Sequence, residues 1–280
     1  MRLGKPVPRS ESPRRKTGAI GDDTRGRADG NDPAKKARRR TPIFIVASPR
    51  PHVGKTFLAR LLMDFLCLEG GKAAAFDLNP SGDALADYFP EVTTTSDLGD
   101  VRGQMTLFDG LVVDNGVGKV IDVGTASYQR FFAIAQEIRF LEEATRRSME
   151  PTILFAADPH QVAVKAYADL RRRFPRAVLV PVINEAVAKG YNLRDQFPYS
   201  REASLALEIP LLEPALKEQV EHASCSFAEL HERPPMRIPS EHAFELRAWT
   251  RRTFLQFREL ELRLLMERLR ASLTGDALQS

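Results

Sequence analysis

The sequence predicts an α/β fold, a mostly parallel sheet with helices on both of its faces. Short, continuous apolar runs alternate with segments of helical periodicity from residue 42 onward. Strands that are buried on both faces have this unbroken apolar character, whereas strands with one solvated face alternate. A strand, a glycine-containing loop and a helix also follow one another directly at residues 43–69. Strands that alternate with helices in this way are typical of parallel sheets.

The expected elements follow in order along the chain. Five apolar runs are predicted strands, at residues 43–47, 72–77, 119–123, 152–157 and 177–183. Helical periodicity lies between them at residues 55–69, 128–147 and 161–173. The first helix is expected to stop at Gly70-Gly71, because glycine readily adopts the left-handed conformation that ends a helix. Residues 92–116 match neither period and receive no assignment.

The first strand runs into a phosphate-binding loop. Residues 53–56 read Val-Gly-Lys-Thr, and a helical pattern begins there. Gly54 lets the backbone approach phosphate oxygens, Lys55 can reach the terminal phosphates and Thr56 can hold Mg²⁺. The full eight-residue motif requires glycine at position 49, where this chain has Pro49. The residues expected to surround the nucleotide are Val53, Gly54, Lys55, Thr56 and Phe57.

Two aspartates lie at the ends of predicted strands. Asp77 closes the second strand and Asp122 belongs to the third. A carboxylate at the mouth of a parallel sheet, beside a phosphate loop, can hold Mg²⁺ or its water ligands. Capping of the next helix is the alternative role for either residue. Asp114 competes with Asp122 for the metal, but Asp114-Asn115-Gly116 reads as a tight turn. We therefore favour Asp122.

Residues 1–40 differ in composition from the rest of the chain. They hold 13 Lys or Arg against 5 Asp or Glu, whereas the whole chain carries a net charge of +4. With few large apolar side chains, this stretch cannot bury enough surface to fold. We expect a solvated, disordered tail at 1–40, with attraction to nucleic acid or an anionic membrane as the alternative. An α/β domain is expected at 41–235 and a helical extension packed on it at 236–280.

The extension is predicted to be one long helix over residues 241–273. One apolar stripe at helical spacing holds Leu246, Trp249, Phe257, Leu260 and Leu264, and it is widened by Leu262, Leu265 and Leu269. We expect this stripe to dock on the domain, with a dimer contact or an amphipathic membrane helix as alternatives. Mixed charges and the absence of lysine speak against membrane binding.

The two cysteines, Cys67 and Cys225, form no CxxC pair, and no apolar run approaches the length of a membrane span. A reducing, cytoplasmic location is therefore expected. His52 is expected to line the loop and His160 to start a helix. Arg171-Arg172-Arg173 could face DNA, or could form a solvated helix end that the helix dipole stabilises.

Together these segments resemble the ParA/MinD family of P-loop ATPases. That family's loop reads Lys-Gly-Gly-Val-Gly-Lys-Thr, and residues 50–56 here read Arg-Pro-His-Val-Gly-Lys-Thr. Its second strand ends in Asp-x-Asp-Pro, and residues 77–80 here read Asp-Leu-Asn-Pro. Residues 182–184 and 208–212 are similar to its adenine-contacting strand end and its last strand. The resemblance covers about residues 42–225.

The resemblance implies ATP and Mg²⁺ as ligands and assigns roles to individual residues. Lys55 would bind phosphates, Thr56 and Asp122 would hold the metal, and Asn184 would face adenine. Arg50 stands where the family has the lysine that reaches the partner's phosphates across an ATP-dependent homodimer. Asn79 stands at the position of the hydrolytic aspartate, with Asp77 near it. An amide orients water but accepts no proton, so hydrolysis is expected to be slow.

The chain is thus interpreted as a ParA/MinD-like, nucleotide-dependent dimerisation switch with slow ATPase activity. The processes that the resemblance implies are DNA or cargo partitioning, positioning and transfer, with non-specific DNA and an unidentified protein as partners. Two alternatives stay open. One is a nucleotide-binding adaptor without hydrolysis, and the other is an ATP-dependent ligase of the dethiobiotin-synthetase type.

Overall fold

The computed structural model describes residues 40–79, 84–197, 206–223, 226–232 and 239–276. The predicted tail lies almost wholly outside the described residues, as do Pro80 and Cys225. No helix in the described part of the chain is both long and apolar enough to cross a bilayer.

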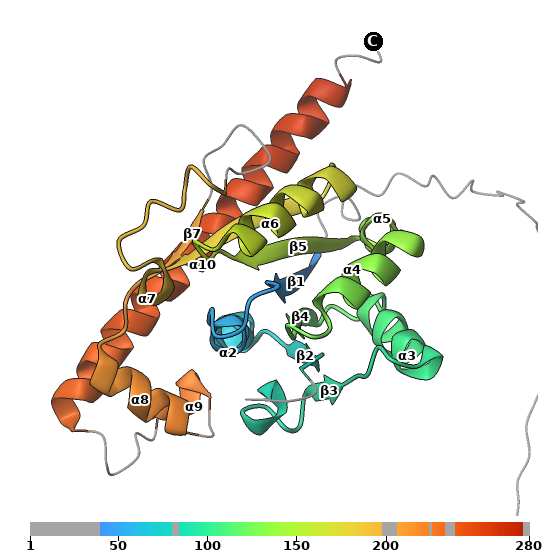
Figure 1. Cartoon of the computed structure of the whole chain (residues 1–280). Helices are drawn as coiled ribbons and strands as arrows, with labels where there is room; N and C mark the ends of the chain where they lie inside the picture. The colour runs from blue at the N-terminus through green and yellow to red at the C-terminus, as the bar shows by residue number, and fades with distance from the viewer. Residues whose placement is uncertain (1–39, 80–83, 198–205, 224–225, 233–238, 277–280) are drawn as a thin grey trace, which may run out of the picture. The chain divides into compact units, whose positions relative to one another are not determined.

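A sheet of seven parallel strands forms the centre of the domain (Figure 1). Its strands are β1 (Thr41–Ala47), β2 (Ala73–Asp77), β3 (Thr93–Thr95), β4 (Gly118–Val123), β5 (Met149–Ala156), β6 (Val178–Asn184) and β7 (Leu207–Ile209). Their spatial order is β3-β2-β4-β1-β5-β6-β7, so β1 lies in the middle. The chain leaves β1 toward β2 on one side, and it leaves the neighbouring β4 toward β5 on the other side. The carboxyl ends of β1 and β4 therefore flank the switch point at which such sheets bind ligands.

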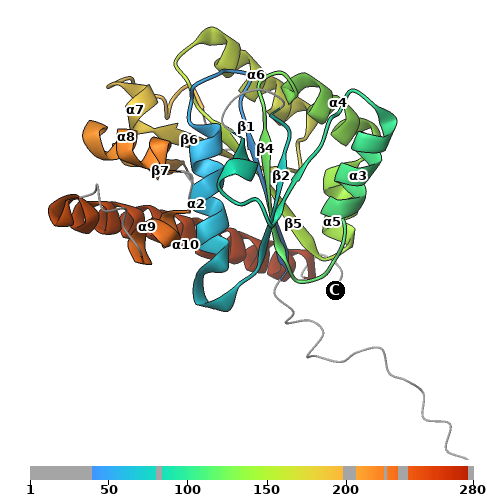
Figure 2. The ribbon, with the colours of Figure 1, turned by 90° about the horizontal axis from the view of Figure 1, so that it is seen from below.

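Helices cover both faces of the sheet, as Figures 1 and 2 show. On one face lie α2 (Lys55–Cys67), α8 (Pro214–His222), α9 (Phe227–Glu232) and α10 (Ser240–Asp276). On the other lie α3 (Val101–Leu111), α4 (Tyr128–Glu137), α5 (Phe140–Arg146), α6 (Gln161–Arg173) and α7 (Glu185–Ala188). The predicted fold class, a parallel α/β sheet with a long C-terminal helix, is confirmed.

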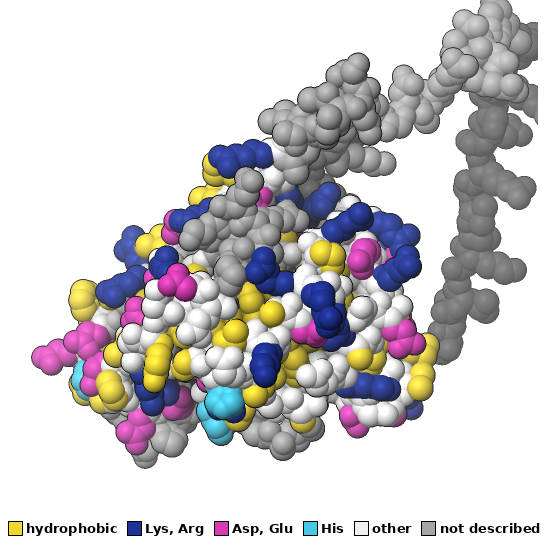
Figure 3. Space-filling view, turned by 45° about the horizontal axis from the view of Figure 1, so that its top comes forward, with side chains coloured by type: hydrophobic (Ala, Val, Ile, Leu, Met, Phe, Trp, Pro, Cys, Tyr) yellow, Lys and Arg dark blue, Asp and Glu magenta, His cyan; other side chains and the backbone are white. Residues whose placement is uncertain are grey.

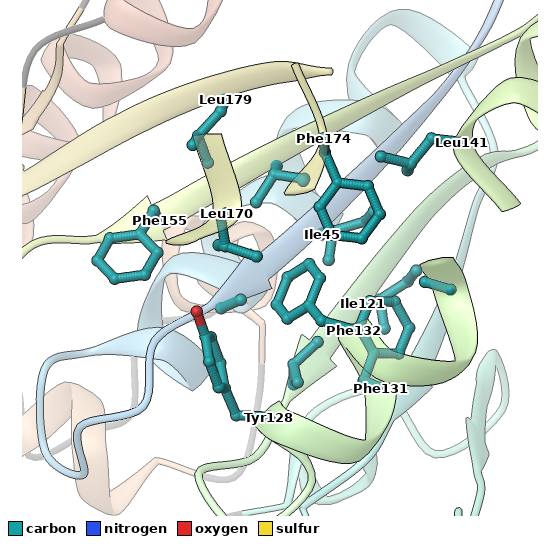
Figure 4. Packing of buried hydrophobic residues seen from close by; sticks show 14 of the residues in the cluster. Ile45, Ile121, Tyr128, Phe131, Phe132, Leu141, Phe155, Leu170, Phe174 and Leu179 are labelled. Atoms are coloured by element: carbon teal, nitrogen blue, oxygen red, sulfur yellow. The ribbon is translucent and has the colours of Figure 1, made fainter. Parts of the chain in front are cut away.

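The central strand explains why unbroken apolar runs predicted this architecture. In β1, Ile43, Ile45 and Ala47 belong to the core under one layer of helices, while Phe44 and Val46 belong to the core under the other. Because successive side chains of a strand point to opposite faces, both sets must be apolar when both faces are covered. Figure 4 shows the first core, where Phe131 and Phe132 of α4 pack below Ile45.

Two stretches differ from the sequence-based expectation. The helix expected over 128–147 is two helices, because Arg139 adopts a left-handed conformation with φ of 51° between α4 and α5. Apolar periodicity continues across this break, so the pattern does not reveal it. The unassigned residues 92–116 contain a short edge strand, β3, and the helix α3. Asp100 starts α3 by accepting a hydrogen bond from the Gly103 amide at 2.7 Å.

The long helix α10 packs against β7, α2 and α9. The expected docking stripe is buried, at Leu246, Trp249, Phe257, Leu260 and Leu264. The expectation that Leu262, Leu265 and Leu269 widen it is wrong, since they are 60%, 45% and 55% exposed. At 3.6 residues per turn, Leu262 lies about half a turn from both Leu260 and Leu264 and so points away from the domain.

Candidate functional site

The loop between β1 and α2 ends in a glycine that the geometry requires. Gly54 has φ of 87°, a left-handed conformation that glycine adopts without a steric penalty. A Cβ atom there would lie 2.7 Å from Nδ2 of Asn184. Lys55 begins α2 directly afterward, so the amides of the first helical turn open toward the loop. Helix N-termini that follow a glycine loop in this way commonly bind anions.

The Lys55 side chain folds back over its own loop. Its Nζ donates to the Arg50 carbonyl oxygen at 2.7 Å and to Thr125 Oγ1 at 3.0 Å. Burial lowers the pKa of Lys55, and the nearby Asp122 opposes that shift. Both partners are neutral oxygen acceptors, so a phosphate oxygen offers the ammonium group a stronger, charge-assisted hydrogen bond.

Thr56 and Asp122 meet beneath the loop. Thr56 Oγ1 donates to Asp122 Oδ2 at 2.6 Å. Asp122 is 1% exposed, and its other oxygen, Oδ1, is buried without a hydrogen-bond partner. Burial raises the pKa of Asp122 to about 7, while the Thr56 hydroxyl and Lys55 act in the opposite direction. A carboxylate with one unused oxygen, next to a loop hydroxyl, fits a hard divalent cation such as Mg²⁺.

The protein provides only part of a coordination sphere. Among the described residues, no group of three or more His, Cys, Asp and Glu side chains could hold a metal ion. Mg²⁺ commonly keeps several waters and binds one or two carboxylates together with substrate phosphates. The pair of Thr56 and Asp122 therefore fits a cation that arrives with a phosphate ligand.

Asp114 lies away from this position. Its Oδ1 accepts a hydrogen bond from Oγ1 of Thr41 at 3.3 Å, and Thr41 is the first residue of β1. The phosphate loop follows the last residue of the same strand. Asp114 thus lies at the amino end of β1, whereas Thr56 follows its carboxyl end. Of these two aspartates, the structure brings only Asp122 to the loop.

Asp77 is buried next to Asp122 but serves the backbone of the loop after β2. Its Oδ1 accepts from the Asn79 amide at 2.8 Å and its Oδ2 from the Leu85 amide at 2.6 Å. Burial raises the pKa of Asp77, and these amide donors oppose the shift. With both oxygens bonded, Asp77 positions the segment that carries Asn79.

The loops after β2 and β4 lock against each other. Ser127 Oγ donates to the Leu78 carbonyl oxygen at 2.6 Å. A Cβ atom on Gly124 would lie 2.7 Å from that same oxygen and 2.8 Å from Cα of Asn79. Thr125, the partner of Lys55, belongs to the second of these loops. The lysine of the phosphate loop is therefore bonded to the element that holds Asn79 in place.

Arg50 turns toward the end of β5. Its Nε lies 3.6 Å from Asp158 Oδ1, and the side chain is 35% exposed. Two residues later, His52 adopts φ of 57°, where a glycine-rich loop would have glycine. This is the left-handed region, which non-glycine residues occupy at a cost.

A cavity of 840 Å³ opens from the loop toward β7 and α10. Asn184, at the end of β6, lines it, although its amide group is already bonded. Its Nδ2 donates to the Val53 carbonyl oxygen at 3.4 Å, and its Oδ1 accepts from the Ala186 amide at 3.1 Å. The cavity is also lined by Lys55, Thr56, Phe57, Asn79 and Trp249.

The other polar residues noted in the sequence have structural partners. His160 starts α6, with Nδ1 accepting from the Val162 amide at 3.2 Å. Arg172 and Arg173 both bond to Asp169. Figure 3 shows Lys and Arg side chains interspersed with Asp and Glu on the viewed face. The arginine cluster at the end of α6 is thus partly neutralised within its own helix.

Comparisons with known proteins add likenesses among solved structures. No protein-family model matches the chain, and no curated protein matches it. Among solved structures, a nucleotide-binding protein of Archaeoglobus fulgidus, in complex with ADP and with cobalt found in it, matches with a TM-score of 0.40. The match has 13% identity and covers 65% of this chain and 87% of that one. Values this low assign no activity to the chain.

Two residues of the site were absent from the sequence-based set. Thr125 stands three residues after Asp122, and the only signal for it is its place in the loop that follows a strand. Trp249 is predicted on the buried stripe of the last helix. No local pattern indicates that it lines the same cavity as Lys55, which lies about 190 residues earlier in the sequence. Both positions depend on tertiary packing.

Proposed function

We propose that the chain binds ATP together with Mg²⁺ and is a ParA/MinD-like, nucleotide-dependent switch with slow ATPase activity. The observation that carries this proposal is the contact of Thr56 with Asp122 at 2.6 Å, directly below a loop that presents Lys55 and a helix N-terminus. The groups that would bind phosphate and a cation thus lie together, as nucleoside triphosphate binding requires.

The chain's own groups divide the work. Lys55 would release the Arg50 carbonyl and Thr125 and turn to phosphate oxygens. Thr56 and the unused oxygen of Asp122 would hold Mg²⁺, which neutralises phosphate charge when bound. Asn79 would orient a water molecule near the phosphate end of the cavity. Because positioning and charge stabilisation account for most of phosphoryl transfer, an amide suffices for slow turnover.

Self-association on ATP binding is the switch that we propose. Arg50 is not among the described residues that line the cavity of its own chain. An arginine at this place could reach a partner's phosphates and bind them with its planar fork. DNA or cargo partitioning, positioning or transfer in the cytoplasm, with non-specific DNA and a further protein as partners, completes the proposal.

A nucleotide-binding adaptor without hydrolysis is the second candidate. It is favoured by the chemistry of the wall, because Glu221 is the sole acid among the described lining residues and it lies on α8, away from the loop. Asn79 cannot take a proton from water. Tight ATP binding with no phosphate release, with and without DNA, would identify the adaptor.

The test is an ATP titration combined with a measurement of molecular mass. We expect wild type to bind Mg²⁺–ATP and to dimerise, Lys55→Ala to lose binding, and Arg50→Ala to bind without dimerising. Lys165→Ala, on the exposed side of α6, is the matched control for loss of a lysine. If wild type and Lys55→Ala bind ATP equally, the phosphate-loop assignment is wrong.

A further inference from the structure

The cavity has two compartments of different chemistry. The loop end is polar and holds the Lys55 ammonium group, the Thr56 hydroxyl and the Asn79 amide. The far end has an apolar wall formed by Phe57, Val187, Ile209, Pro210, Leu212 and Trp249. Lys217 and Glu221 of α8, an ion pair with 3.5 Å between Nζ and Oε1, also line the cavity. Apolar compartments with a few polar groups at the rim suit flat, aromatic ligands.

The spacing of the two compartments follows from the sheet. The loop follows β1 and the apolar compartment lies at the end of β7, which is three strands away in the order β1-β5-β6-β7. At about 4.8 Å per strand spacing, the carboxyl ends of β1 and β7 are roughly 14 Å apart. The loop extends part of this way, because Asn184 at the end of β6 donates to the Val53 carbonyl oxygen at 3.4 Å. A ligand with phosphates at one end and an aromatic group at the other spans such a cavity.

Trp249 is held in place at the apolar end. Its Nε1 donates to the Pro210 carbonyl oxygen at 3.0 Å, so the indole is tied to the segment after β7. Its ring also packs against Phe57, two residues after Lys55, with 5.7 Å between the ring centroids. A second neighbour, Phe227 of α9, is stacked at 6.1 Å. The indole is thus a rigid part of the wall.

From this arrangement we infer that Trp249 of α10 forms the wall of a nucleobase compartment, so that the C-terminal helix completes the nucleotide site. The inference rests on the proposed function, since the phosphates must lie at the loop. It adds a base-contacting residue from a helix outside residues 42–225, where the family resemblance lies. The base of the bound nucleotide contacts the indole, and α10 becomes part of the ligand-binding unit.

The first experiment uses the full chain and its single tryptophan, which makes the fluorescence signal specific. Mg²⁺–ATP should change the emission of Trp249 along a saturable curve. Tripolyphosphate with Mg²⁺ carries no base, so it should compete with ATP and leave the emission unchanged. ATP binding seen by calorimetry without an emission change, or an equal change with tripolyphosphate, would overturn the inference.

The second experiment compares affinities of variants for the two ligands. Trp249→Leu should weaken ATP binding about tenfold, the scale of one lost aromatic contact. It should leave tripolyphosphate binding unchanged. Phe257→Leu is the matched control, because Phe257 is also buried on α10 but packs on Phe65 of α2, with ring centroids 5.3 Å apart. That control should leave the ratio of the two affinities as in wild type.

Two further outcomes separate the inference from the proposed function. Trp249→Phe keeps an aromatic ring but loses the bond to Pro210 and part of the ring surface. It should bind ATP within about threefold of wild type, and it is the variant to use if Trp249→Leu does not fold. Lys55→Ala should lose both ligands. If wild type binds both ligands and Trp249→Leu weakens both equally, only the inference fails. If wild type binds neither ligand, the proposed function fails with it.

Discussion

Thr56 of the phosphate loop donates a 2.6 Å hydrogen bond to Asp122 of β4, and Oδ1 of Asp122 is buried without a partner. A buried polar atom without a partner is costly, and at Asp122 a bound cation would supply the missing partner. The register explains how the two residues meet, because Asp122 pairs with Val46 just before β1 turns into the loop. The helix α2 that follows β1 thus brings a hydroxyl to a carboxylate of the neighbouring strand β4.

The first prediction concerns the cation. Thr56→Val keeps the side-chain shape and removes the hydroxyl, so the gain in ATP affinity that Mg²⁺ provides should fall about tenfold or more. Calorimetric titrations with Mg²⁺ and with EDTA measure that gain. Thr145→Val is the control, since its hydroxyl bonds only to a helix carbonyl, that of Leu141. An unchanged Mg²⁺ effect in Thr56→Val would remove the hydroxyl from the metal site.

A second prediction concerns stability and pH. Burial raises the pKa of Asp64 on α2 to about 6, opposed by the Phe227 amide and Arg60. Between the unfolded pKa and about 6, the folded state binds more protons than the unfolded state, so unfolding free energy falls as pH rises through that window. Asp64→Asn should flatten this slope in urea denaturation measured from about pH 4 to about pH 7.

Asp109→Asn, on the exposed side of α3, controls for the change in net charge. Asparagine at position 64 can still accept from the Phe227 amide, which lies 2.7 Å from Asp64 Oδ2. If wild type and Asp64→Asn show the same slope across the window, the shifted pKa does not belong to Asp64.

The third prediction concerns strain in the loop. His52 has φ of 57°, and a left-handed residue with a Cβ costs about 1–2 kcal/mol. Glycine removes that cost but adds about 0.4–1 kcal/mol of unfolded-state entropy. The first effect is larger, so His52→Gly should raise the unfolding free energy by about 0.5–1 kcal/mol. Arg139→Gly, at φ of 51° between α4 and α5, should behave alike.

Urea denaturation without nucleotide measures both variants. A gain in Arg139→Gly with a loss in His52→Gly would mean that the histidine side chain stabilises the loop through contacts of its own. In that case the contacts of the His52 side chain would outweigh the strain of its left-handed backbone.

Local sequence patterns predicted most of the helices and strands, whereas the features that depend on tertiary packing were not predicted. The run at residues 43–47 fills both cores, and it is part of the strand β1. Position 139 shows the limit, because a single left-handed residue divides a helix without interrupting its apolar period. Residues 93–95 show another, since three threonines form an edge strand through pairing with β2 alone.

The site divides in the same way. The motif at residues 53–56 placed Lys55 and Thr56 correctly at a helix start, because that signal is contiguous in sequence. Whether Asp122 or Asp114 lies near the loop depends on the end of the strands at which each one is placed, and the strand register shows this where the sequence does not. Trp249 reaches the cavity because α10 docks on the domain. The apolar periodicity of α10 predicts that this helix docks, but it does not predict where on the sheet α10 lies.

The last prediction concerns hydrolysis at Asn79. Asn79→Asp supplies a carboxylate that can accept a proton from the attacking water, so turnover should rise about tenfold or more at saturating Mg²⁺–ATP. The backbone should keep its place, because the Asn79 amide remains bonded to Asp77 Oδ1 at 2.8 Å. Asn115→Asp, in the turn before β4, is the matched control, and phosphate release is the measurement. Because the added charge lies near two buried aspartates, ATP affinity without Mg²⁺ should fall. Equal turnover in Asn79→Asp and wild type, with ATP bound by both, would show that position 79 does not act on the attacking water.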